Sequence, residues 1–175
     1  MRYEPNPEAS AGNSQHPMND DHITSDTWVK RTQELLDSWE RWMHEPLIER
    51  CSPVKDALRV SNADFVLVSH GTEADPLLNF ANRAALRLWQ MSVEQFSGTP
   101  SRLTAEPVHR AERAALLART TRDGFISDYS GIRIASTGQR FEIHRATVWN
   151  IVDGEGNPAG QAAMFRDWTM LEVGS

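Results

Sequence analysis

The chain has 175 residues, of which 39% are hydrophobic and 24% charged, so it is long enough for one ordinary folded domain with an additional extension. Its formal net charge of -6 argues against general nucleic-acid binding, because phosphate backbones are bound through a surplus of clustered Lys and Arg. The single cysteine, Cys51, excludes an internal disulfide or a cysteine-based zinc cluster, and without a membrane-length apolar run or a signal peptide we expect a cytoplasmic protein with no membrane partner.

The first 62 residues divide into two predicted segments. Residues 1–21 are rich in Pro, Asn, Ser, Glu and Asp, so we expect a disordered tail. Residues 22–62 are expected to form a helical extension. Its first helix is capped near Ser25 and ends at Pro46, and a second helix begins at Pro53.

Large apolar side chains follow one face of the first predicted helix: Trp28, Leu35, Trp39 and Trp42. Two interpretations of this stripe remain open. It covers the outer face of the protein's own sheet, or it is the interface of a homodimer. We favour packing within the chain, since such a stripe more often belongs to a core than to an interface.

Residues 63–170 are predicted to form an α+β core. Two short strands are expected at residues 64–71 and 77–80. Asn82 is a suitable N-cap for a helix that places Trp89 on its apolar face, and Ser92 with Gln95 has the pattern of a capping box.

A longer helix is predicted from about Pro107 to a C-cap at Gly124. Its buried face is expected to carry Ala111, Ala114, Leu117, Ala118 and Thr121. Arg110, Glu112 and Arg113 are expected on the wet side. Period-two patterns then predict three strands at residues 125–135, 140–152 and 159–168, which gives five strands in all.

Strand alternation in residues 140–152 predicts which side chains face the interior. Arg145 and Thr147 fall on the same face as Phe141, Ile143, Trp149 and Ile151, whereas Glu142, His144 and Asn150 share the other. A buried Arg145 needs an anion, which is either a ligand carboxylate or phosphate or an internal carboxylate such as Asp128.

Several segments in order resemble the MEKHLA domain. They are Asn79 to Leu86, Pro100 to Pro107, Gly124 to Ile126, Tyr129 to Arg133, Ala146 to Asn150 and Gly160 to Ala163, within a match from roughly Trp39 to Trp168. The resemblance implies a PAS-like five-stranded antiparallel sheet with helices on one face, preceded here by the N-terminal amphipathic helices. It further implies a domain that senses a signal or controls dimerisation, and no established ligand or reaction.

We therefore expect a non-catalytic sensory domain that binds a small acidic or aromatic molecule in its core. The predicted ligand-binding residues are Trp89, Tyr129, Arg145, Thr147, Trp149 and Gln161, with Arg133 as a lesser candidate. One alternative is a pure interaction module with a filled core, which dimerises through Trp28, Leu35, Trp39 and Trp42. A less favoured alternative is a small α+β enzyme that uses Asp128 or His144.

No cofactor or metal is assigned from the sequence. A photoreactive flavin needs a cysteine beside the ring, and Cys51 lies far upstream of the core. Haem needs an axial ligand, for which His109 is the best placed histidine, although a lone histidine on a solvated helical turn is usually a surface residue.

Overall fold

A computed structural model describes residues 18–172 of the chain. Residues 1–17, which make up most of the predicted tail, lie outside the described range. Within it the predicted tail ends earlier than expected, because Met18 is buried and the side chain of Asn19 caps a helix that starts at Asp20.

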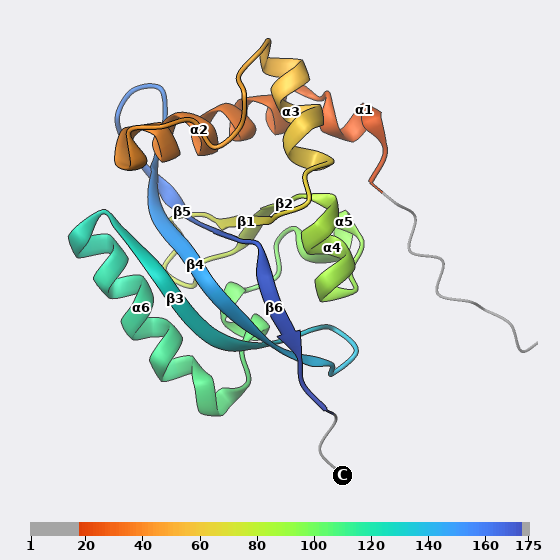
Figure 1. Cartoon of the computed structure of the whole chain (residues 1–175), viewed down its shortest axis with the longest axis vertical. Coiled ribbons are helices and arrows are strands. Elements are labelled where there is room, and N and C mark those ends of the chain that lie inside the picture. The colour runs from red at the N-terminus through yellow and green to blue at the C-terminus, as the bar shows by residue number, and fades with distance from the viewer. Residues whose placement is uncertain (1–17, 173–175) are drawn as a thin grey trace, which may run out of the picture.

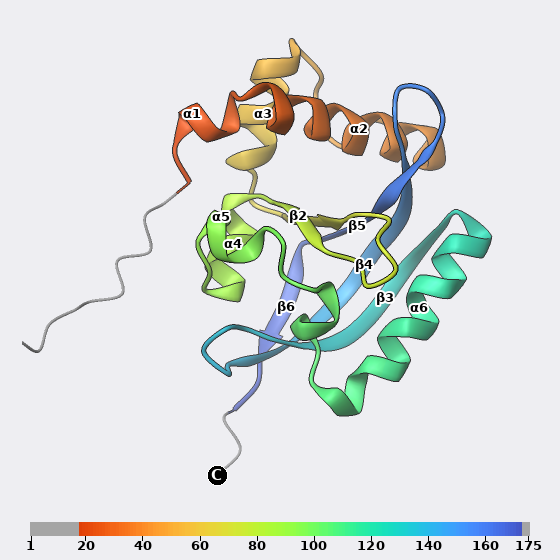
Figure 2. The same ribbon diagram turned by 180° about the vertical axis from the view of Figure 1, so that it is seen from behind.

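The described chain forms an antiparallel sheet between two groups of helices (Figures 1 and 2). The sheet order is β2-β1-β5-β4-β3, and β6 pairs with β4. The elements in chain order are α1 (Asp20–Ile23), α2 (Asp26–Met43), α3 (Pro53–Ser61), β1 (Val66–His70), β2 (Leu78–Ala81), α4 (Arg83–Trp89), α5 (Val93–Phe96), η1 (Ser101–Thr104), η2 (Pro107–His109), α6 (Arg110–Asp123), β3 (Phe125–Ile134), β4 (Arg140–Val152), β5 (Pro158–Phe165) and β6 (Asp167–Met170).

Local capping chemistry sets most helix boundaries where the sequence predicts them. The side chains of Ser25 and Asn82 accept backbone hydrogen bonds at the starts of α2 and α4. Ser92 and Gln95 form the predicted capping box of α5, and α6 ends at Gly124 with a positive φ of 91°. Each of these side chains or conformations satisfies backbone groups that a helix end leaves unpaired.

Helix α2 covers the outer face of the sheet, which confirms packing within the chain. The rings of Trp39 and Trp149 meet edge to face at 5.0 Å, and Trp42 Nε1 donates to the Asn150 carbonyl at 3.0 Å. Trp28, Leu35 and Trp39 are buried and Trp42 is half-buried. The predicted dimer interface is therefore occupied by the protein's own sheet and does not form an exposed apolar surface.

The last predicted strand is divided at Arg166, and β4 is bent opposite the division. The Thr147–Val152 half of β4 pairs with β5 and its Phe141–His144 half with β6. Between these halves Arg145 takes a positive φ of 51°, which marks a bulge. The described sheet therefore has six strands, of which β5 and β6 follow one edge of β4.

This bulge corrects the predicted alternation along β4. Ile143 faces the helices α4 to α6, but after the extra residue Ala146 and Val148 take over that face. Arg145 is exposed and forms an ion pair with Asp167. Thr147 and Trp149 consequently turn toward α2, because the side-chain period of a strand is two and one inserted residue reverses it.

Helix α6 is also rotated relative to the prediction. Its buried residues are Arg113, Leu116 and Thr120, whereas Ala111, Ala114, Ala118 and Thr121 are exposed and Leu117 is half-buried. Small alanine side chains contribute little apolar area, so a stripe of them constrains a helix weakly. Leu116 therefore determines which side of the helix faces the sheet.

Candidate functional site

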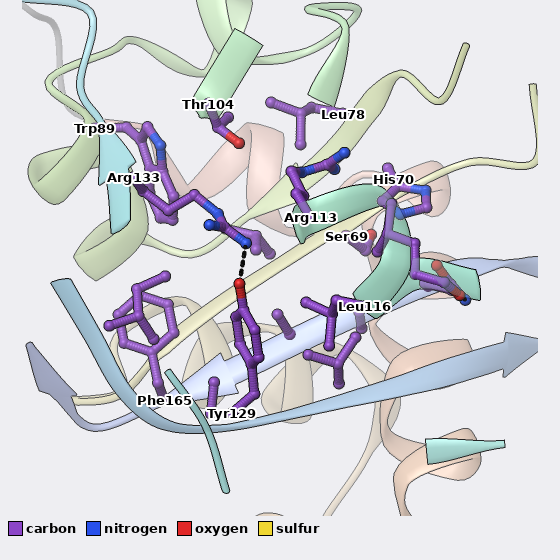
Figure 3. A pocket seen from close by; sticks show the side chains of 18 of the residues that line it. Ser69, His70, Leu78, Trp89, Thr104, Arg113, Leu116, Tyr129, Arg133 and Phe165 are labelled. Atoms are coloured by element: carbon purple, nitrogen blue, oxygen red, sulfur yellow. Dashed lines mark hydrogen bonds between the residues drawn. The ribbon is translucent and has the colours of Figure 1, made fainter. Parts of the chain in front are cut away.

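A cavity of about 70 Å³ lies between α6, α4 and the inner face of the sheet (Figure 3). Its wall is mostly apolar and includes Val68, Leu78, Phe96, Leu116, Ile143, Val148 and Phe165. Polar side chains enter it from β1, β3, β5 and α6: His70, Arg113, Tyr129, Arg133 and Gln161. A volume of this size holds a few water molecules or a ligand of a few non-hydrogen atoms.

Arg133 and Tyr129 form one polar corner of the cavity. Arg133 is 6% exposed, and its Nη1 and Nη2 donate to the Ile132 carbonyl at 2.8 Å and to the Tyr129 hydroxyl at 3.1 Å. The Tyr129 hydroxyl in turn donates to Glu112 Oε1 at 3.1 Å. Because burial raises the pKa of Tyr129, its hydroxyl keeps its proton at neutral pH.

Gly131 makes this corner geometrically feasible. It lies between Tyr129 and Arg133 in β3, so the three residues fall on the same face of the strand. A Cβ atom at position 131 would overlap the Tyr129 hydroxyl and crowd Arg133 Nη1 at 3.2 Å. The missing side chain leaves the space through which the phenol reaches the guanidinium.

Arg113 reaches the cavity from α6. It is 9% exposed, and its Nη2 donates to Ser101 Oγ at 2.7 Å. Burial, and after it repulsion from Arg133, lower the pKa of Arg113 to about 10, so the group remains a cation at neutral pH. Within residues 18–172, neither Arg113 nor Arg133 forms an ion pair with a carboxylate.

His70 lies at the end of β1 and is 8% exposed. Its Nδ1 is 2.9 Å from the Gly71 carbonyl oxygen, which assigns the proton to Nδ1 and leaves Nε2 as an acceptor. Nε2 is buried and has no hydrogen-bond partner in the described part of the chain. Burial, together with the Arg113 and Arg31 charges, lowers the pKa of His70, so the imidazole is neutral at pH 7.

Gln161 has a structural role at the cavity edge. Its Nε2 lies 3.0 to 3.1 Å from three acceptors, namely the Leu117 carbonyl, Thr121 Oγ1 and Asn150 Oδ1. These contacts join β5 to α6 and β4. The Gln161 amide nitrogen is therefore already occupied by the protein.

Three of the six predicted ligand-binding residues line the cavity, namely Trp89, Tyr129 and Gln161. The bulge in β4 places the other three, Arg145, Thr147 and Trp149, outside it. The lesser candidate Arg133 does line the cavity.

The sequence reasoning missed Arg113 and His70. The spacing of Arg113, Leu116 and Thr120 fits one helical face, so the sequence did indicate that Arg113 could be buried. His70 continues the alternation of Val66 and Val68, so the sequence also indicated that His70 could share their face.

The cofactor and catalytic candidates lie elsewhere. Cys51 is exposed before α3, and neither it nor His109 lines the cavity. Asp128 is exposed, and His144 is within 2.8 Å of Thr169 on the other face of β4. Among the described residues, no group of three His, Cys, Asp or Glu side chains is arranged to hold a metal ion.

None of the helices in residues 18–172 has the length and apolar character needed to cross a membrane.

A family model of the MEKHLA domain matches residues 29–170, which confirms the predicted resemblance over slightly wider bounds. A comparison with curated protein sequences gives no significant match.

Solved structures with a similar fold include the PAS domain of a protein from Colwellia psychrerythraea. It has a TM-score of 0.57 and 15% identity, and the match covers 65% of this chain and 93% of that one. A light-oxygen-voltage domain studied with a flavin analogue gives a TM-score of 0.50 at 18% identity, over 68% of this chain and 84% of that one. An RNA-binding light-oxygen-voltage receptor gives a TM-score of 0.52 at 16% identity, over 73% of this chain and 37% of that one. At these identities the likeness establishes a shared fold.

Proposed function

Because the chain belongs to the MEKHLA domain family and has a PAS-like fold, we propose that it is a non-catalytic sensory domain that binds a small molecule in the cavity beneath α6. One observation carries the proposal. The wall of the cavity is mostly apolar, yet the buried His70 Nε2 that borders it has no partner in the described chain. Buried polar groups are normally satisfied, so an unsatisfied acceptor at a cavity favours a ligand over a filled core.

The contacts of Arg31 provide a route by which occupancy of the cavity reaches the opposite side of the sheet. From α2, Arg31 donates to the Ala159 carbonyl at 2.9 Å and to the His70 carbonyl at 3.1 Å. It also pairs with Glu34 at 3.1 Å. A shift of β1 on binding would therefore change the hydrogen bonds that Arg31 makes from α2, so ligand binding could favour one position of α2 over another.

The test compares the same substitution inside and outside the cavity. Ala146 lines the cavity and is buried, whereas Ala118 on α6 is exposed. Native mass spectrometry of the protein from its own host should show a retained small molecule in the wild type and in Ala118→Leu. Ala146→Leu fills the cavity and should lose the molecule.

Circular dichroism serves as the folding control for both variants, since overpacking a core is itself destabilising. A folded Ala146→Leu variant that retains the same molecule would refute binding in this cavity. Clean unliganded wild type that gains no thermal stability from a metabolite mixture would refute the proposal as a whole.

A further inference from the structure

We propose that the cavity recognises a small carboxylate, whose anionic group is held by Arg113 and Arg133 and whose short apolar body packs on the cavity wall. This inference rests on the proposed function, because it assigns a chemical class to the ligand of the same cavity. Figure 3 shows the two arginines reaching the same space from α6 and β3, with Tyr129 beneath Arg133.

Positive charge is concentrated at the cavity. Arginine does not lose its proton in proteins, so Arg113 and Arg133 bring two cations into a largely apolar space. Each is more than nine-tenths buried, and repulsion between them contributes to the altered pKa of Arg113. Buried charges without counter-ions are strongly disfavoured, and an anion between these two groups would remove the imbalance.

The nearby carboxylates are committed to other groups. Asp75 pairs with Arg102 at 3.2 Å, at a site where both side chains are about half-exposed. Glu112 accepts from the Tyr129 hydroxyl. Within residues 18–172, no carboxylate therefore forms a direct ion pair with Arg113 or Arg133.

Two partly buried arginines elsewhere in the fold, Arg50 and Arg31, provide an internal comparison. Arg50 has three carboxylate partners at 2.8 to 3.1 Å, contributed by Asp37, Glu40 and Asp56. Arg31 has Glu34. Arg31 and Arg50 therefore have carboxylate partners within the chain, whereas Arg113 and Arg133 have none within residues 18–172.

Both arginines keep N–H donors that form no hydrogen bond within residues 18–172. Arg113 uses only Nη2 in a hydrogen bond within residues 18–172, and Arg133 uses its two terminal nitrogens but not Nε. A guanidinium presents five N–H donors in a planar fork that matches the two oxygens of a carboxylate. Arg113 therefore retains the Nε and Nη1 donors for an oxyanion.

The size and polarity of the cavity limit the ligands that fit it. A space of about 70 Å³ favours a ligand of a few non-hydrogen atoms over nucleotides, sugar phosphates and polycyclic ligands. Leu116, Ile143 and Phe165 form apolar parts of its wall. A free phosphate has no apolar group that could pack against them. A monoanion with a short hydrocarbon body satisfies both the arginines and this wall.

The experiment uses the full chain and measures thermal stabilisation and calorimetric binding with three probes. Butyrate should bind, whereas its neutral analogue butyramide, with nearly the same shape, should bind at least tenfold more weakly. Inorganic phosphate supplies an oxyanion without an apolar body, and it should also bind at least tenfold more weakly. This comparison within the wild type needs no variant to fold.

Variants then test the two arginines. Arg113→Gln and Arg133→Gln should each lower butyrate affinity at least tenfold, and each should raise the melting temperature of the unliganded protein because it removes a buried unpaired charge. The control is Arg145→Gln, since Arg145 is exposed and pairs with Asp167 outside the cavity. It should leave butyrate affinity unchanged.

The outcomes separate this inference from the function on which it rests. If butyrate and butyramide bind equally well and Ala146→Leu abolishes both, the cavity binds ligands but the carboxylate inference is wrong. Phosphate that binds as tightly as butyrate would also overturn it. If no probe binds and native mass spectrometry finds no retained molecule, the proposed function fails as well.

Discussion

The structure predicts an unusually large loss of stability when Asn82 is changed to Ala, since its buried side chain joins three elements. It is 0% exposed and makes four hydrogen bonds to backbone groups. Oδ1 accepts from the Leu67 and Ala85 N–H groups, each at 3.1 Å. Nδ2 donates to the carbonyls of Val60 at 3.2 Å and Phe65 at 2.7 Å.

The magnitude follows from the groups that lose their partners. Loss of the N-cap at Ala85 costs about 1 kcal/mol. Each buried backbone group left unpaired costs about 1–3 kcal/mol, and this applies to Leu67 and Phe65, whereas the Val60 carbonyl keeps the Ala63 N–H. Allowing for incomplete additivity, we expect Asn82→Ala to lower the free energy of unfolding by about 3–5 kcal/mol.

Urea denaturation followed by circular dichroism measures this loss, and Asn82→Ser is the matched variant. Serine is nearly as good an N-cap as asparagine but is too short to bridge the other groups. We therefore expect its loss to be about 1 kcal/mol smaller than that of alanine. If both variants lost less than about 1 kcal/mol, the reasoning that these buried hydrogen bonds stabilise the fold would be refuted.

Three further predictions concern titration and backbone geometry. Because burial lowers the pKa of His70, the unfolded chain takes up a proton before the folded chain does as the pH falls below about 6.5. The stability of the unliganded protein should fall in that range, and the fall should be shallower for His70→Gln, as read from urea midpoints at several pH values. Gly160 has a φ of 114°, and a Cβ there would overlap the His70 carbonyl. Gly160→Ala should cost about 1–3 kcal/mol in urea titrations, whereas the unconstrained Gly154→Ala should be nearly neutral; equal effects would contradict this. Burial opposes ionisation of Asp56, but hydrogen bonds from a backbone N–H and from Arg50 lower its pKa overall. Asp56→Asn should therefore cost about 2–3 kcal/mol at pH 7, and the difference from wild type should begin to shrink as the pH falls below about 4 and disappear only below the lowered pKa of the folded state; a pH-independent difference would argue against the ion pair.

The features that could be predicted from the sequence depend on local chemistry. Asn82 and the Ser92–Gln95 box cap helices because their side chains reach backbone groups only two or three residues away. The β4 strand has the predicted bounds, Arg140–Val152, because its alternating apolar residues are flanked by turn residues.

The features that could not be predicted depend on contacts between distant segments. The bulge at Arg145 lies where β4 passes from pairing with β6 to pairing with β5, and no glycine marks it in the sequence. In α6, the orientation depends on how Leu116 and Arg113 fit against β3 and η1, which an alanine-rich helical pattern does not reveal. Half of the predicted site was lost through the first effect, and Arg113 was missed through the second.

Because the tryptophans are distributed over the two faces of the sheet, intrinsic tryptophan fluorescence can report on the cavity. Of its six tryptophans, Trp89 alone lines the cavity. Trp28, Trp39 and Trp149 belong to the packing between the outer face and α2. A molecule that enters the cavity should therefore change the emission of one indole while others serve as an internal reference, so occupancy can be followed without an attached dye.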